Sequence, residues 1–151
     1  MIPFGKAKVV REGTDLTVIT YGATVQRSVV AAKALEEERG ASVEIIDLRT
    51  LSPVDWETVY GSIRKTNRAM VVYEDSMSWG YGAEIAARVT ERCFRFLHAP
   101  ILRVTGFDIP YPPPMLESMH LPNVDRILDT IARLQWDDVP DQRWLEAGSR
   151  A

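Results

Sequence analysis

The segment 43–55 constrains the fold of this chain more than any other. It reads V-E-I-I-D-L-R-T-L-S-P-V-D, an apolar β-branched run that ends in a charged pair and then a proline. Such a run is typical of a buried strand, Pro53 cannot continue it, and Asp55 is a good N-cap for a following helix. The pattern therefore predicts a strand that delivers Asp47 and Arg49 to the rim of a sheet, where open α/β folds hold ligands and partners.

Strand-like and helix-like segments alternate along the rest of the chain, which is typical of a parallel α/β sheet. Strands are predicted at 7–11, 16–21, 43–48, 69–74 and 101–105. Helical patterns end at Gly40, follow Asp55 and Gly82, and are clearest between Pro122 and Leu134. The pattern supports a three-layer α/β/α domain. Local spacing alone would join the first two strands as a hairpin.

Length and composition indicate one globular domain. The chain has 151 residues, of which 46% are hydrophobic and 26% charged. A net charge of -3 argues against a general nucleic-acid binder, because phosphate binding needs a basic surface. No apolar run approaches the roughly 20 residues of a membrane span, and the N-terminus lacks the pattern of a signal peptide. We therefore expect no nucleic acid or membrane as partner, and a cytoplasmic location.

The cysteine and the two histidines offer little catalytic chemistry. Cys93 is the only cysteine, so the chain has no intrachain disulfide, and its helical spacing predicts a buried apolar role rather than a nucleophile. His98 and His120 lack the spacing of metal ligands, and we expect both near the surface.

Five motifs resemble one known family in order and spacing. They are I-P-F-G-K-A at 2–7, R-E-G-T-D-L-T-V-I-T-Y-G at 11–22, the segment 43–55, G-A-E-I-A-A-R at 82–88 and A-P-I-L-R-V-T-G-F-D-I-P-Y-P at 99–112. The chain resembles the C-terminal, transketolase-like domain of the beta subunit of thiamine-diphosphate-dependent 2-oxoacid dehydrogenases, which act on pyruvate, branched-chain 2-oxoacids or acetoin. We therefore divide it into a transketolase C-terminal-like domain at 1–135 and a C-terminal extension at 136–151.

The resemblance implies a different topology from the hairpin. It implies a mixed five-stranded sheet in the order 1-3-2-4-5, with strand 1 antiparallel at an edge. That order places a switch point between the second and fourth strands, so the segments 21–24 and 74–78 should border one crevice.

The resemblance also implies that this chain is not catalytic by itself. In the family, the alpha subunit binds the cofactor's diphosphate and magnesium, and the N-terminal domain of the beta subunit supplies the activating glutamate. This chain has neither segment, and it contains no G-D-G motif. We therefore expect no catalytic residue, cofactor site or metal ligand here, although the parent enzyme uses thiamine diphosphate and magnesium.

The implied function is assembly and partner binding within an enzyme that decarboxylates a 2-oxoacid and passes the acyl group to a lipoyl arm. The implied partners are the alpha subunit, the N-terminal beta domain, a second beta subunit and, as a further candidate, a lipoyl acyltransferase core. A free-standing small-ligand or regulatory module that uses the switch-point crevice is the alternative.

Arg49 and Glu74 are the candidate contacts at the substrate mouth. Related thiamine enzymes carry an arginine in the D-x-R-x-x-x-P-x-D context of Arg49, and in the sugar-phosphate synthases it contacts the substrate phosphate. Because 2-oxoacids have no such phosphate, we expect Arg49 to anchor a neighbouring domain, with an intradomain pair to Asp47 or Asp55 as the alternative. Glu74 precedes Asp75 and a Gly80-Tyr81-Gly82 turn. That turn could bind an anion at a helix N-terminus, but a purely structural turn is the preferred interpretation.

His98 marks a departure from the family. Dehydrogenase beta subunits commonly carry an acidic residue before the A-P dipeptide, which helps to hold a basic domain of the acyltransferase core. Here His98 takes that position, and the chain continues past the usual end of the family with an acidic segment that includes Asp137 and Asp138. We therefore expect core binding to be weak, or to be mediated by the acidic tail that includes Asp137 and Asp138, and we expect any residual affinity at His98 to fall as pH drops below about 6.5.

Overall fold

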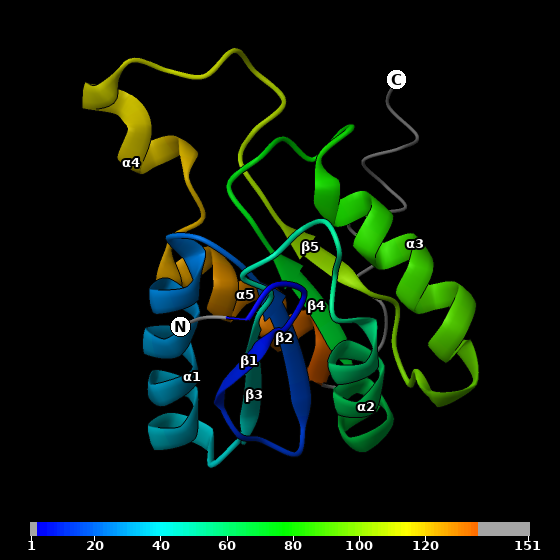
Figure 1. Ribbon diagram of the computed structural model, residues 1–151. Coiled ribbons are helices and arrows are strands. Elements are labelled where there is room, and N and C mark those ends of the chain that lie inside the picture. Colours follow the sequence, from blue (N-terminus) through cyan, green and yellow to red (C-terminus); the bar gives the residue numbers. More distant parts are fainter. Residues whose placement is uncertain (1–2, 136–151) are drawn as a thin grey trace, which may run out of the picture.

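A single five-stranded sheet organises the domain (Figure 1), and the computed structural model describes residues 3–135. The strands are β1 (Lys8–Arg11), β2 (Leu16–Thr20), β3 (Val43–Asp47), β4 (Ala69–Val72) and β5 (Leu102–Val104), in the order β1-β3-β2-β4-β5. Only β1 is antiparallel to its neighbour, β3, and the other pairs are parallel. The predicted topology is thus confirmed, and the local hairpin interpretation is wrong because β1 pairs with β3 and not with β2.

Five α-helices connect or cover the strands: α1 (Thr24–Arg39), α2 (Trp56–Thr66), α3 (Tyr81–Cys93), α4 (Glu117–His120) and α5 (Val124–Gln135). Two short 3-10 helices, η1 (Phe94–Phe96) and η2 (Pro114–Leu116), lie in the later loops. Local capping residues explain where α1 ends and where α2 begins. Gly40 ends α1 with a left-handed φ of 67°, and the Asp55 carboxylate caps α2 by accepting a hydrogen bond from the Thr58 backbone N–H at 3.3 Å.

Two apolar clusters lie on opposite faces of the sheet, which gives the predicted three layers. One joins α1 and α5 to the sheet through residues such as Val18, Ala32 and Ile127. The other joins α2 and α3 to it through residues such as Ile46, Ile63 and Ile85. Cys93 belongs to the second cluster and is buried, as predicted, and this burial raises the pKa of its thiol. Within residues 3–135, no helix is long and apolar enough to cross a bilayer.

His120 differs from expectation. It was predicted near the surface, but it is only 4% exposed. Its ring packs edge-on against Phe107 at 6.0 Å and Tyr111 at 5.2 Å between ring centroids. The expectation was wrong because the long connection from β5 to α5 folds over this side chain, which a local pattern does not reveal. His98 is exposed, as predicted.

Candidate functional site

The carboxyl ends of β2 and β4 bring together the two segments predicted to border a crevice. The rings of Tyr21 and Tyr73 stack with centroids 6.4 Å apart. The Thr24 hydroxyl donates to the Val72 carbonyl oxygen at 3.2 Å. A Cβ placed on Gly22 would have the Glu74 Oε1 atom as its nearest neighbour, at 4.0 Å. The segments 21–24 and 74–78 therefore lie side by side at this rim, as predicted.

Tyr21 is a hydrogen-bond donor at this rim and not a base. Burial raises the pKa of its phenol to about 12, and the negative charge of Asp75 adds to the effect. The phenol therefore stays protonated at neutral pH. It can donate a hydrogen bond to a partner or ligand, but it cannot accept a proton.

Arg49 stands directly beyond β3 in a left-handed backbone conformation, with a φ of 57°. Its backbone N–H donates to Asp47 Oδ1 at 3.1 Å, and its Nε lies 3.7 Å from Asp47 Oδ2. The intradomain pair is therefore with Asp47, whereas Asp55 is occupied as the cap of α2. Within residues 3–135 the Arg49 guanidinium makes no other hydrogen bond or ion pair, so most of its donors remain open to a partner.

Glu74 follows β4 on the same rim and is half-buried. Its carboxylate accepts no hydrogen bond from any residue between 3 and 135. One cation, Arg49, whose only ion pair among residues 3–135 is with Asp47, and one anion, Glu74, thus lie on this edge of the sheet, flanking β2. Such charges suit complementary contacts with another polypeptide.

The Gly80-Tyr81-Gly82 turn has a steric explanation. A Cβ on Gly82 would lie 2.0 Å from Cε1 of the Tyr73 ring, and a Cβ on Gly80 would lie 2.2 Å from the Ser76 carbonyl oxygen. Only glycine allows α3 to begin this close to Tyr73. The geometry supports the structural interpretation of the turn, and the motif needs no bound anion.

Loops beyond the rim are clamped together by polar contacts. Asp108 accepts hydrogen bonds from the Ser78 hydroxyl at 2.6 Å and the Ser78 backbone N–H at 2.9 Å. These bonds lower the pKa of the Asp108 carboxyl, and the bond from the Ser78 hydroxyl has the larger effect. Arg103 donates to the Met77 carbonyl oxygen at 2.7 Å. The loop after β4 is therefore fixed to the loop after β5.

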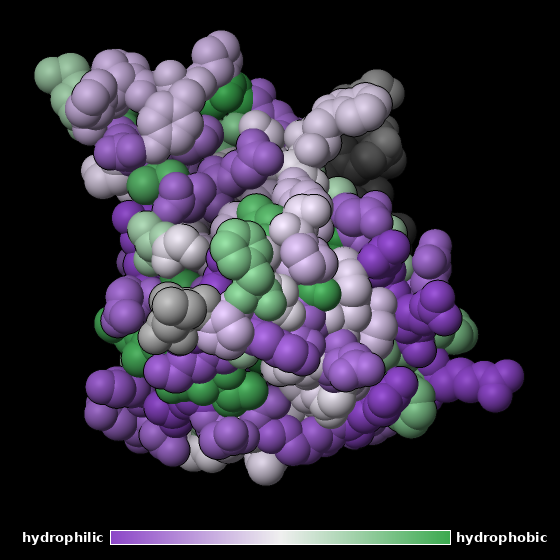
Figure 2. Space-filling view, viewed as in Figure 1, coloured by the Kyte–Doolittle hydropathy of each residue, from purple (hydrophilic) through white to green (hydrophobic). Residues whose placement is uncertain are grey.

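The connection from β5 to α5, which includes η2 and α4, exposes the apolar side chains of Ile109, Tyr111, Met115, Leu116 and Met119, which we call the rim patch. Within this patch Met115 is 83% exposed and Met119 73%. Trp79, in the loop before α3, is 100% exposed. Figure 2 shows mostly pale purple, weakly hydrophilic side chains with a few green, hydrophobic ones at the upper left, where Figure 1 places α4. Sequence analysis missed this patch. The sequence did contain a signal for it, because the segment 109–119 has several large apolar residues but neither helical nor strand periodicity to bury them.

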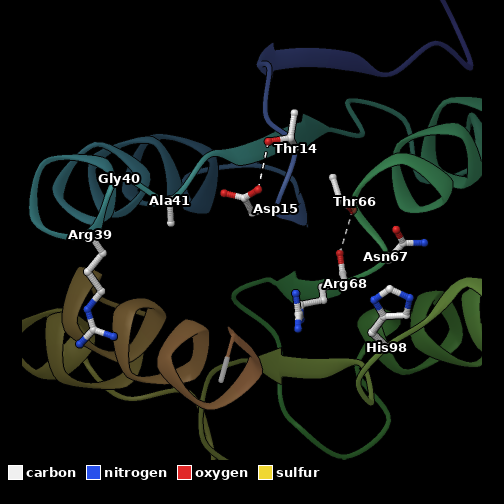
Figure 3. Close-up of a pocket in the computed structure, with 9 residues that line it drawn as sticks. All are labelled: Thr14, Asp15, Arg39, Gly40, Ala41, Thr66, Asn67, Arg68 and His98. Atoms are coloured by element: carbon white, nitrogen blue, oxygen red, sulfur yellow. Dashed lines mark hydrogen bonds between the residues drawn. The ribbon is translucent and has the colours of Figure 1, made fainter. Parts of the chain in front are cut away.

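The amino ends of the strands hold two surface pockets away from this rim. The first, shown in Figure 3, has a volume of about 460 Å³. Its lining residues are Thr14, Asp15, Arg39, Gly40, Ala41, Thr66, Asn67, Arg68 and His98. The second, of about 1010 Å³, runs along α3 and β5 and is lined by residues that include Ala87, Leu97, His98 and Ile101. Sequence analysis did not predict these pockets, because separate loops build them.

The predicted site residues that the structure describes therefore lie at two opposite ends of the sheet. Arg49 and Glu74 share the carboxyl-end rim, whereas His98 lies at the amino-end pockets. Asp137 and Asp138 lie outside the described residues. Between residues 3 and 135, no group of three His, Cys, Asp or Glu side chains lies close enough together to hold a metal ion.

The sheet order, the antiparallel edge strand and the switch-point rim define an open α/β domain of mixed topology. Residues 5–127 match the family described as "Transketolase, C-terminal domain". The chain belongs to this family.

Known relatives are named as beta subunits of 2-oxoacid dehydrogenases. The chain is 48% identical over 132 residues to the 3-methyl-2-oxobutanoate dehydrogenase subunit beta of Mycobacterium tuberculosis, which covers 87% of this chain and 38% of the relative. It is 45% identical over 133 residues to the pyruvate dehydrogenase E1 component subunit beta of Bacillus subtilis, which covers 88% and 41%. The chain thus spans about two fifths of the length of the curated relatives it matches.

Solved structures support the fold. A split-gene transketolase, described as an inactive beta4 tetramer, superposes with a TM-score of 0.72 at 24% identity, covering 87% of this chain and 41% of that one. A 2-oxoglutarate:ferredoxin oxidoreductase from Magnetococcus marinus superposes with a TM-score of 0.55 at 14% identity, covering 87% and 19%.

Proposed function

We propose that this chain is the C-terminal assembly and partner-binding domain of the beta subunit of a thiamine-diphosphate-dependent 2-oxoacid dehydrogenase. The observation that carries the proposal is the 48% identity to the 3-methyl-2-oxobutanoate dehydrogenase subunit beta of Mycobacterium tuberculosis over 87% of the chain. In this proposal the complete enzyme decarboxylates a 2-oxoacid and transfers the acyl group to a lipoyl arm. Thiamine diphosphate and magnesium are held by the alpha subunit and the N-terminal beta domain.

The rim supports a binding role for this domain. The rim patch exposes large apolar side chains in the connection that leaves the carboxyl end of β5, and Arg49 and Glu74 follow the carboxyl ends of β3 and β4. An apolar surface surrounded by polar groups is typical of a protein interface. We propose that this rim contacts the N-terminal beta domain and the alpha subunit, and that Arg49 and Glu74 orient the contact at the substrate mouth. A second beta subunit is a further proposed partner.

The alternative function, a free-standing module that binds a small ligand in the switch-point crevice, has less support. Stacked Tyr21 and Tyr73 occupy that position, and neither of the two pockets described above opens there. Binding of a lipoyl acyltransferase core through His98, Asp137 and Asp138 stays a prediction.

Co-purification tests the proposed function. We would co-express this chain with an alpha subunit and the matching N-terminal part of the beta subunit from the Mycobacterium tuberculosis relative, and measure the mass of the complex by light scattering. We expect a ternary complex, and the double variant Met115→Ser, Met119→Ser should weaken it. Val30→Ser, which replaces an exposed apolar residue of α1 outside the rim patch, is the control. Elution of this chain alone, with the other two parts assembled, would contradict the proposal.

A further inference from the structure

Arg68 has an unsatisfied guanidinium in the amino-end pocket of Figure 3. Its backbone is fixed at the start of β4, because its carbonyl oxygen accepts hydrogen bonds from the Thr17 N–H at 2.9 Å and the Thr66 hydroxyl at 3.1 Å. Its Nε is buried and has no hydrogen-bond partner. No hydrogen bond or ion pair to its side chain is present within residues 3–135. A buried donor without an acceptor is costly, so an acceptor placed at this Nε would stabilise the half-buried Arg68 side chain.

The charges around Arg68 favour a negative occupant. Arg39 lines the same pocket, and Asp15 is the one acidic residue among its lining residues. The Asp15 carboxylate is already engaged, because it accepts hydrogen bonds from the Ser42 N–H at 2.7 Å and the Thr14 hydroxyl at 3.0 Å. Figure 3 shows Arg68 in the middle of the pocket, between Asp15 and His98.

We propose that this pocket is an oxyanion-binding site anchored by Arg68. The planar fork of an arginine matches the oxygens of a carboxylate or a phosphate, and a charge-assisted bond to it would satisfy the buried Nε. The site lies at the opposite end of the strands from Arg49 and Glu74, and the inference does not depend on the proposed dehydrogenase function.

The oxyanion has two possible sources. One is a small free anion, such as a phosphate or a carboxylate. The other is the chain itself, because α5 ends at Gln135, and Leu134 belongs to the same apolar cluster as Ala41, which lines the pocket. Asp137 and Asp138 follow within two or three residues, a span of up to about 10 Å. Both sources present the same chemistry to Arg68.

An NMR titration of the full chain tests the site. We would add inorganic phosphate, and separately acetate, to the ¹⁵N-labelled protein at constant ionic strength. We expect saturable shifts of the amides of Thr14, Ala41, Asn67 and Arg68. Arg68→Met retains the apolar stem without the charge, and it should weaken phosphate binding about tenfold or more. Arg68→Lys should have an intermediate effect, and Arg92→Ala, an exposed arginine of α3 outside the pocket, should have none.

The double variant Asp137→Asn, Asp138→Asn distinguishes the two sources. If these carboxylates occupy the site, the variant should bind phosphate several-fold more tightly than the parent chain. Equal binding by both chains identifies a free anion as the occupant. The proposal is overturned if neither chain shows saturable shifts at the pocket, or if a folded Arg68→Met or Arg68→Lys variant binds phosphate as the parent chain does.

Discussion

Lys65 on α2 forms an ion pair with Glu44 on β3, and the carboxylate of Glu44 is buried inside the domain. The Glu44 side chain is 2% exposed, whereas that of Lys65 is 42% exposed. Glu44 also accepts a hydrogen bond from the Gly13 N–H at 3.3 Å. Lys65 therefore pairs with a buried carboxylate that is also hydrogen-bonded to the loop between β1 and β2. The pair links α2, β3 and this loop.

Removal of Lys65 should destabilise the fold. In Lys65→Met the Glu44 carboxylate stays buried but loses its charged donor, which costs about 1–3 kcal/mol of unfolding free energy. The partial exposure of Lys65 places the expected value in the lower half of this range. Urea unfolding at pH 7 would measure it. Lys33→Met, at an exposed position of α1, is the control. Equal losses in the two variants would contradict a specific role for the pair.

Stability should fall in mild acid. Burial raises the pKa of Glu44, but hydrogen bonds from Lys65, Ser62 and Gly13 outweigh burial and lower the pKa below its ordinary 4.5. For Asp55, burial is likewise outweighed, by bonds from Thr58 and the Ala7 N–H, so its pKa is also lowered. A carboxyl with a lowered folded pKa contributes stability above its unfolded pKa, and this is lost as pH falls through the folded value.

Urea unfolding at a series of pH values would check this acid dependence. The midpoint should be constant near neutral pH and decline as pH falls below about 4.5. Glu44→Gln has no charge to lose at this position, so its midpoint should decline less steeply over the same range. Parallel declines in the parent chain and the variant would show that Glu44 is not responsible.

Two glycine-to-alanine substitutions test the close packing of Gly82 against Tyr73, one at Gly82 itself and one at Gly61 as the comparison. Gly82→Ala would place a Cβ 2.0 Å from the Tyr73 ring, so α3 or the ring must move, and we expect a loss of about 1–3 kcal/mol. Gly61→Ala lies inside α2, where the new Cβ would meet no atom within 4 Å apart from the chain neighbours and backbone of its own helix, and it should stabilise the domain by about 0.5–1 kcal/mol. Thermal unfolding would measure both. A Gly82→Ala variant as stable as the parent chain would contradict the packing argument.

The order of the strands could be predicted from the family resemblance, whereas local spacing suggested a hairpin, and the Asp55 cap followed from local capping chemistry. The burial of His120 could not, since it depends on Phe107 and Tyr111 folding back from the connection between β5 and α5. The predicted strand 69–74 is shorter in the structure. β4 ends at Val72, although the Tyr73 N–H still bonds to the Val104 carbonyl oxygen at 3.0 Å. The unsatisfied Arg68 was not predictable either, because no local pattern shows which side chains lack a partner.

Arg49 should matter to the assembled enzyme more than to the isolated domain. Its guanidinium contacts only Asp47 among the described residues, so Arg49→Ala should leave the stability of this chain within about 1 kcal/mol of the parent value. In the complete enzyme, the same substitution should lower turnover or loosen the subunits. Steady-state kinetics and light scattering on the whole enzyme would measure this. Unchanged turnover and unchanged assembly would contradict a role in assembly, and Arg49 would then serve only in its ion pair with Asp47.

The most direct test of the central claim is a chimeric dehydrogenase. The C-terminal part of the Mycobacterium tuberculosis 3-methyl-2-oxobutanoate dehydrogenase subunit beta that matches this chain over 132 residues would be replaced by the corresponding residues of this chain. The chimera would be purified with its alpha subunit, and decarboxylation of 3-methyl-2-oxobutanoate would be measured. We predict an assembled enzyme with turnover within about tenfold of the parent, which corresponds to about 1.4 kcal/mol of activation free energy. A chimeric subunit that folds but neither binds the alpha subunit nor supports turnover would contradict the account.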